Sequence, residues 1–294
     1  MAAEYQFKRE AKVYIVYGGN QYNIDISEIS FVQTFVEQSI SSKTIQSQEM
    51  FERSIINKAN PANFSFTFPA IRQDDLKVVF DRALDYQTFD LYIQTKQDVY
   101  KLRNCIITNG TFIIEKLLPL SMSITGEASQ LTIPGALSSD PVIARDSSRT
   151  YNKVSDIVIL LGGSSDLTDS LNSISVELQN NIKWNPWETL QGVCEVGETA
   201  TLLYPETFVL ESRELGGVIT LYITDTNDTA LQTYGLNTPL NIEVGQDVYG
   251  FRFNMSDCFF KNNIGTNEIF TQSYTWRLTQ NPTNLSDIVS YATL

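Results

Sequence analysis

Apolar and polar residues alternate along much of the chain, and the clearest example is the run of Phe64, Phe66 and Phe68. Serine and threonine separate these phenylalanines, which is the two-residue period of a strand that buries one face. Residues 218–223 form a comparable apolar run in the second half of the chain. We therefore expect both segments to be strands, at corresponding places in the fold.

A helix is predicted over residues 74–85, because its apolar residues recur at spacings of three and four and form one stripe. Asp74 and Asp75 open this segment, where negative charge complements the dipole of a helix N-terminus. A shorter helix is expected in the second half, around residues 228–234. The apolar stripe consists of Leu76, Val79, Phe80, Ala83 and Leu84.

The chain contains an internal repeat. The sequence Gln-Asp-Val-Tyr occurs at 97–100 and again at 246–249, an offset of 246 − 97 = 149 residues. Further upstream, glycine pairs beginning at Gly18 and Gly162 follow apolar runs, with an offset of 162 − 18 = 144 residues. A slowly growing offset is what small loop insertions between two copies of one unit would produce, so we predict a duplicated domain.

The predicted fold class is mainly β with one short helix per repeat, arranged as two tandem β-sandwich or partly closed barrel domains. A chain of 294 residues is long enough for two domains that each bury a core. Residues 133–152 are rich in serine, proline and turn formers, which indicates a linker. We therefore expect one domain over 1–132 and a second over 153–294, with their last strands near 120–127 and 269–278.

Two further segments are candidates for contacts between proteins. Residues 37–62 form a long polar insertion that carries Met50, Phe51 and Ile55, and we expect it to be a contact arm. The second half has no obvious segment equivalent to this arm at the same length. Trp184 and Trp187 are expected to be packing or subunit-interface anchors, although a sugar-stacking platform is the other reading of such a pair.

Composition removes several function classes. The chain has no histidine, and so it lacks the commonest general base and metal ligand, and we expect no enzyme, catalytic residue, cofactor or metal. A net charge of −13 disfavours tight nucleic-acid binding, although a surface along which a polyanion slides stays possible. The three cysteines are far apart and lack the spacing of a metal site. No apolar segment is as long as that of a signal peptide or a membrane span. We therefore expect a protein of a cytoplasm-like compartment.

The layout of the chain resembles the tail-tube proteins of tailed bacteriophages, in the form that fuses two tube domains. The resemblance is carried by the tandem β units, the helix after a central strand, the polar arm and the stretch at residues 171–182. It implies a homotrimer that forms a pseudo-hexameric ring with an inner β-barrel, and rings that stack into a conduit for DNA. It further implies a virion location after assembly in the host cytoplasm, with tape-measure, terminator and baseplate or tail-tip proteins as partners.

Two alternatives remain from the sequence. A baseplate hub or tube-initiating protein would also be trimeric and built from paired tube domains. A carbohydrate- or receptor-binding β-sandwich module would instead use Trp184 and Trp187 as its platform. The copy number in a purified particle separates the first alternative from a tube subunit, and glycan binding tests the second.

Overall fold

Strands make up most of the regular structure in the computed structural model, which describes residues 10–40, 53–69, 73–115, 120–143, 157–162, 165–185, 203–224, 238–245, 251–266, 268–279 and 287–291. The first half contains β1 (Lys12–Tyr17), β2 (Asn20–Ile24), β3 (Glu28–Val32), β4 (Phe35–Ile40), β5 (Arg53–Ala59), β6 (Ala62–Pro69), α1 (Gln73–Asp85), β7 (Phe89–Gln94), β8 (Val99–Glu115), β9 (Ser121–Ala128) and β10 (Gln130–Thr132). The second half contains β11 (Ile157–Leu161), β12 (Ser165–Asp166), β13 (Leu171–Trp184), β14 (Phe208–Tyr222), β15 (Thr238–Val244), β16 (Phe251–Thr266), β17 (Phe270–Leu278) and β18 (Val289–Tyr291).

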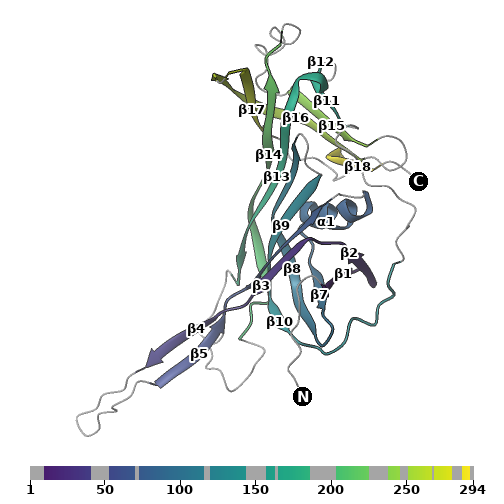
Figure 1. Cartoon of the computed structure of the whole chain (residues 1–294). Helices are drawn as coiled ribbons and strands as arrows, with labels where there is room; N and C mark the ends of the chain where they lie inside the picture. The colour runs from purple at the N-terminus through teal and green to yellow at the C-terminus, as the bar shows by residue number, and fades with distance from the viewer. Residues whose placement is uncertain are drawn as a thin grey trace, which may run out of the picture.

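The two halves pair their strands in the same order. In the first half the order is β2-β1-β7-β8-β9-β6-β3, and in the second half it is β12-β11-β15-β16-β17-β14-β13. All of these neighbours are antiparallel, and a short strand joins the corresponding long strand in each half, β10 on β8 and β18 on β16. Figure 1 shows the first half below and the second half above, with β13 and β14 extending the sheet of the first half. The predicted mainly β class is confirmed.

A β-bulge marks the same position in both halves. The register of the β7 and β8 pair shifts at the buried Cys105, and the register of the β15 and β16 pair shifts at the buried Cys258. Leu91 lies opposite the residue three before Cys105, and Leu240 lies opposite the residue three before Cys258. A bulge is a specific local feature, so this shared position fixes which residues of the two halves are equivalent.

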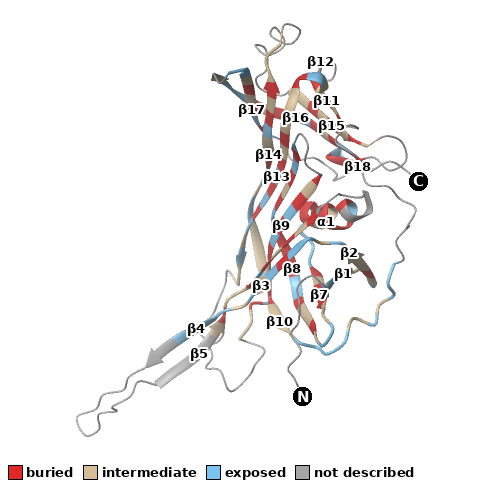
Figure 2. Ribbon diagram, in the orientation of Figure 1, coloured by how far each residue is buried: buried red, intermediate tan, exposed pale blue. Residues whose placement is uncertain are grey.

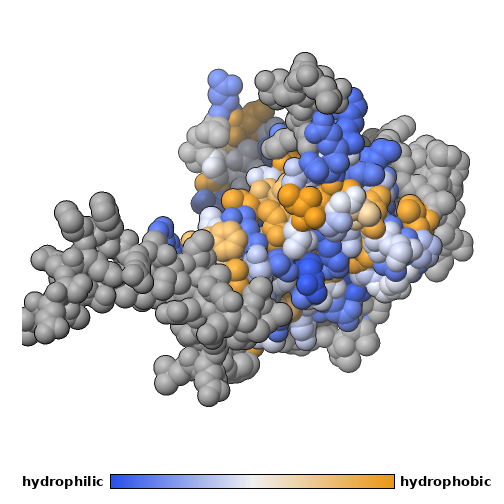
Figure 3. Space-filling view, turned by 90° about the horizontal axis from the view of Figure 1, so that it is seen from below, coloured by the Kyte–Doolittle hydropathy of each residue, from blue (hydrophilic) through white to orange (hydrophobic). Residues whose placement is uncertain are grey.

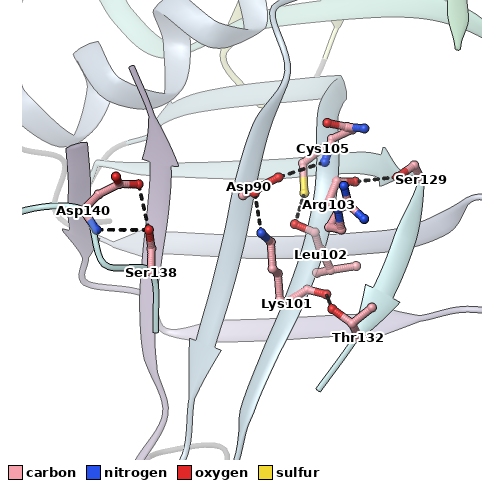
Figure 4. Close-up of polar contacts among 10 residues, drawn as sticks. Asp90, Lys101, Leu102, Arg103, Cys105, Ser129, Thr132, Ser138 and Asp140 are labelled. Carbon is pink, nitrogen blue, oxygen red and sulfur yellow. Dashed lines mark hydrogen bonds and ion pairs between the residues drawn. The ribbon is translucent and has the colours of Figure 1, made fainter. Parts of the chain in front are cut away.

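Polar contacts hold the bulge of the first half in place (Figure 4). Asn104 has a φ of 50°, and its backbone N–H, turned out of the ladder, donates to Asp90 Oδ1 at 3.0 Å. The other carboxylate oxygen of Asp90 lies 2.7 Å from Lys101 Nζ, and Ser129 donates from both its backbone and its hydroxyl to the Arg103 carbonyl. The polar groups that the bulge frees therefore find partners, which keeps it from slipping.

Counting along the paired strands from the bulge gives the other equivalent positions. They are Tyr100 and Phe253, Gly110 and Asn262, Phe112 and Ile264, Leu120 and Phe270, Ile124 and Tyr274, Phe66 and Ile219, Ile29 and Ile174, and Phe35 and Asn180. The same register places a hydroxyl pair at one position in both halves. Thr67 bonds to Ser123 at 3.1 Å, and Thr220 bonds to Ser273 at 3.3 Å.

The repeated Gln-Asp-Val-Tyr motif is the wrong guide to this equivalence. Tyr100 lies opposite Ile93, whereas the residue opposite the equivalent Ile242 is Phe253. Tyr249, which the motif would match to Tyr100, lies outside the described residues. The connection between the paired strands is longer in the second half, and this length difference breaks the sequence match.

The predicted local elements agree with the structure where it describes them. The predicted helix is α1, and its predicted apolar stripe is buried against the sheet. β6 buries Phe64, Phe66 and Phe68 on one face, as their alternation predicts. The strands predicted to end the two halves are β9 and β17, which begin within one residue of their predicted starts, but the short strands β10 and β18 follow them. The predicted helix around 228–234 lies outside the described residues.

The two halves share one buried core. A single apolar cluster includes residues of both halves, and α1 lies beside their junction (Figure 1), where Phe80 meets Phe253 at 5.3 Å. The described part of the predicted linker lies against β2: Gln21 Nε2 donates to the carbonyls of Ser138 and Asp140, and Val142 forms a parallel bridge with Gln21. The domain boundaries near 132 and 153 stay a prediction.

Candidate assembly edges

The halves are joined by a strand ladder rather than by a loop alone. β13 pairs antiparallel with the C-terminal part of β8, from Ser173 opposite Glu115 to Gln179 opposite Asn109. The result is one run of eight strands, β3-β6-β9-β8-β13-β14-β17-β16, that crosses both halves. The junction within the chain therefore shows how one repeat pairs with another.

Phe112 of β8 is the central apolar side chain of this junction. It is fully buried, lies opposite Val176 of β13, and contacts the rings of Phe251 and Phe253 at 5.8 Å each. Aromatic rings packed at this distance stabilise beyond the area they bury. The first half therefore inserts one ring into the core of the second.

A buried amide reinforces the junction. Asn180 of β13 is only 2% exposed, and its Nδ2 donates at 2.9 Å to the carbonyls of Ala83 and Ile107. Ala83 belongs to the last turn of α1, where backbone carbonyls lack partners within the helix. Asn180, on a strand of the second half, thus provides a hydrogen-bond donor for two carbonyls of the first half, one at a helix terminus and one in a strand.

Arg213 completes this polar contact. Its Nε donates to Asn180 Oδ1 at 2.9 Å, and its guanidinium lies 5.1 Å from the ring centre of Tyr86. Burial lowers the pKa of the guanidinium, and its Nη2 is buried without a hydrogen-bond partner among the described residues. We refer to Asn180, Arg213, Tyr86 and the Ala83 carbonyl as the polar lock.

Trp184, predicted from sequence as a packing or interface anchor, lies at the far end of the junction. Its Nε1 donates to Glu127 Oε2 of the first half at 2.7 Å, and its ring packs on Phe208 at 5.4 Å. The indole therefore links β13 to β9 across the junction. Its role as an anchor in an assembly stays a prediction.

Replacing Trp184 with phenylalanine should lower the free energy of unfolding by about 1–2 kcal/mol, because a ring of similar shape remains while the donor to a carboxylate is lost. Urea denaturation followed by circular dichroism measures this. A Glu127→Gln variant keeps an acceptor oxygen and should lose less. A Trp184→Phe variant as stable as the parent would show that the bond contributes nothing.

The run of eight strands ends in two edges that have no strand partner within the described ranges. The first is the outer edge of β3, which pairs only with β6. The second is on β16, where β15 stops at Cys258 and no described strand pairs with residues 262–266 on that side. Unpaired edges invite pairing with another chain, and proteins without a partner usually protect them.

Apolar side chains stand exposed at both edges instead of being protected. Val32 is 52% exposed at the β3 edge, and Ile264 and Phe270 are 55% and 57% exposed at the β16 end. Phe112 and Leu120, the counterparts of Ile264 and Phe270 in the first half, are buried. Seen from below, at the end away from the second half, apolar side chains gather in a band (Figure 3).

One face of the eight-strand run is polar. Buried and exposed residues alternate along β13 and β14 (Figure 2). Hydroxyl side chains occur at outward positions of every strand of the run except β16, and cations are few there. The serines and threonines on this face are Ser30, Ser65, Thr67, Thr111, Ser121, Ser123, Thr125, Ser173, Ser175, Thr220, Thr271, Ser273 and Thr275. We call this surface the hydroxyl face.

The predicted contact arm is only partly described. β4 and β5 form a two-stranded antiparallel ribbon, in which Ile55 lies opposite Gln38, whereas Met50, Phe51 and Trp187 lie outside the described residues. The ribbon corresponds to the extended ends of β13 and β14, which stay paired as far as Trp184 opposite Phe208. The second half therefore has a counterpart of the described part of the arm, which the sequence did not reveal.

The sequence reasoning also missed the residues of the polar lock and the pair Phe112 and Ile264. The available signal was the position of Cys105 and Cys258, because each lies within a long apolar strand of its half. Asn180 sits in a strand of otherwise alternating pattern and gives no signal of its own. Its partners come from elements 97 and 73 residues away, and only the fold brings them together.

The described residues contain no cluster of three or more potential metal-ligating side chains. Both described cysteines are buried, and burial raises the pKa of Cys105 well above its ordinary value and that of Cys258 to about 12. Within the described ranges, no helix has the length and apolarity needed to cross a membrane.

Residues 3–83 match the model of the Bacteriophage Baseplate Tube Protein Family, a stretch that reaches from before β1 into α1. This match confirms the resemblance to phage tube proteins. A chain of the cryo-EM structure of the anti-feeding prophage baseplate, six-fold symmetrised, is similar with a TM-score of 0.39 and 12% identity, covering 46% of this chain and 98% of that chain. No curated protein matches the chain significantly.

Proposed function

We propose that the chain is a non-catalytic structural subunit of a phage tail or baseplate tube, which joins copies of itself edge to edge around a central conduit. The family match of residues 3–83 supports the tube assignment. Self-association is supported by one observation above the others: two repeats of one sheet are already joined by the β8 and β13 ladder, and each free end of the run is the counterpart of a joined one.

Three chains would present six similar units, and closing them into a ring would leave no strand edge unpaired. In this ring the hydroxyl face turns toward the conduit. Hydroxyl groups hydrogen-bond with water and offer no positive charge, so a passing DNA backbone would find few groups that hold its phosphates. The scarcity of lysine and arginine on the hydroxyl face and the net charge of −13 agree with this role.

Stacking of rings is assigned to the β4 and β5 ribbon, which projects from the first half (Figure 1). Its predicted apolar contacts are Met50, Phe51 and Ile55. Further contacts, to tape-measure, terminator and baseplate or tail-tip proteins, belong to the same proposal, as do the virion location and assembly in the host cytoplasm.

Electron microscopy of the purified chain tests the proposal. Concentrating the protein should produce rings with a central hole or stacked tubes, and light scattering should show a species of three chains or its multiples. Protein that remains monomeric at all concentrations, with smooth isolated particles, would contradict self-assembly into a conduit.

A baseplate hub or tube-initiating protein is the second candidate, and the description of the matched family, which names the baseplate, favours it. The two candidates share the fold and the ring and differ in number. A tube subunit occurs in many rings per particle, whereas an initiator occurs in one. Quantitative mass spectrometry of intact particles therefore separates them.

A further inference from the structure

We infer that the β3 edge of one copy pairs antiparallel with residues 262–266 of β16 in a second copy, with Phe31 opposite Ile264. This inference rests on the proposed function and adds the register and side chains of the contact between chains. The partner is a second copy of this chain, because the required counterpart edge is present on the chain itself.

The register follows from the junction inside the chain. There, Ile174 lies opposite Ile114 and Val176 lies opposite Phe112. The equivalents of Val176 and Phe112 are Phe31 and Ile264. The shared bulge and the strand pairings establish this, once one extra residue of β8 between Ile107 and Asn109 is counted. When the free edges pair in the same register as this ladder, Phe31 lies opposite Ile264, and Val32 lies opposite Asn263.

Exposure supports this placement, because two apolar positions of the repeat are buried in the first half and exposed in the second half, where no described strand covers them. Phe112 is fully buried under β13, while its equivalent Ile264 is 55% exposed. Leu120 is 1% exposed, while its equivalent Phe270 is 57% exposed. An exposed isoleucine and phenylalanine in the place of two core residues indicate a surface that another strand covers.

The β3 edge offers a matching site. Phe31 and Tyr100 are partly buried and contact each other at 5.3 Å, and Tyr100 is the equivalent of Phe253, which packs against Phe112. Ile264 of a second copy would therefore lie against Phe31 and Tyr100. A cavity of about 340 Å³ lies beside this edge and is bordered by Ile29 and Ser30 of β3 and by Ser65, Phe66 and Thr67 of β6.

The two kinds of junction differ in one respect. The positions of Asn180 and Arg213, which form the polar lock inside the chain, are occupied at the free edge by Phe35 and its strand partner Ala59. Phe35 is 45% exposed and has no polar group with which to satisfy a carbonyl. The contact between copies is therefore apolar where the contact within the chain is polar, and added salt should not dissociate it.

Paired cysteines test the register in the full-length chain. Val32 and Asn263 are exposed on the hydroxyl face, and directly opposed residues bring their Cβ atoms within disulfide reach. The Val32→Cys, Asn263→Cys double variant, made with Cys194→Ser, should oxidise into covalent oligomers of up to three chains on a non-reducing gel. The two buried native thiols, held protonated, should not interfere.

The matched control is Val32→Cys with Lys261→Cys, which shifts the second cysteine by two residues on the same face. Rings that cross-link through position 261, or through neither position, would overturn the register and leave the proposed function standing. A parent protein that forms no oligomer at all would overturn both.

A charge at the central contact supplies a second measurement. Ile264→Asp should weaken self-association by more than about tenfold, because a carboxylate would be buried against two rings. Its unfolding midpoint should match the parent, since Ile264 is exposed in the single chain. Val142→Asp, which is equally exposed but lies beside β2, should assemble normally. Normal assembly of the Ile264→Asp variant would contradict the inference.

Discussion

Replacing Gly217 with alanine should lower the free energy of unfolding by about 3 kcal/mol or more. A Cβ at this position of β14 would overlap the backbone carbonyl oxygen of Ser175 in β13, and it would also lie 3.1 Å from Trp276 Cζ2. A flexible side chain could turn away, but a backbone carbonyl within a ladder cannot move without separating two strands. Urea denaturation followed by tryptophan fluorescence and circular dichroism measures the loss.

Gly110→Ala is the matched control for this change. Gly110 is also in the middle of a long strand, but a Cβ there would meet only the ends of the Ile124 and Met122 side chains, at 3.2 and 3.4 Å. Because those ends can shift, we expect a loss of no more than about 1 kcal/mol. Equal stabilities of the two variants would show that β13 and β14 accommodate the extra carbon without separating.

The close approach at Gly217 is half of an exchange between the repeats. In the first half Phe64 of β6 lies opposite Gly126 of β9, and in the second half Gly217 of β14 lies opposite Trp276 of β17. The positions are equivalent, with the aromatic residue and the glycine on swapped strands. Each pair provides one large ring that covers a strand position without a side chain, so the total volume is kept while the sequences diverge.

This exchange explains why the sequence predicted the individual strands better than the equivalence of strands between the two halves. The period of Phe64, Phe66 and Phe68 and the stripe of the helix are local, and each identified its element correctly. The equivalence of the halves is not local. A glycine facing a tryptophan has no likeness in sequence to a phenylalanine facing a glycine. The visible Gln-Asp-Val-Tyr repeat has an offset of 246 − 97 = 149 residues, whereas the equivalent residues Tyr100 and Phe253 differ by 253 − 100 = 153.

The assembly edges were harder to predict for the same reason. Ile264 and Phe112 are both apolar residues of long strands, and nothing in their neighbouring residues distinguishes the exposed one from the buried one. The difference lies in whether another strand covers them. That depends on β13, which follows β8 by more than fifty residues and yet pairs with it.

Phe112→Ala should be as disruptive as the glycine variant, at about 3–5 kcal/mol, because it leaves a cavity between the two halves. The ring is fully buried and contacts Phe251 and Phe253, so its loss removes packing from both repeats at once. Hydrogen exchange should accelerate in β8 and β13 more than in β1 and β2. Urea denaturation gives the total, and Phe112→Leu, which restores most of the volume, should lose no more than about 1.5 kcal/mol.

The equivalent variant in the second half supplies the decisive comparison. Ile264→Ala removes apolar atoms from the same position of the repeat, but in the single chain that side chain is exposed, and stability should stay within about 0.5 kcal/mol of the parent. In the assembled state the two positions should become alike, so Ile264→Ala should then lower the dissociation temperature of the rings. A large loss in the isolated chain would mean that Ile264 is already covered, and that the β16 edge is not free to receive a second copy.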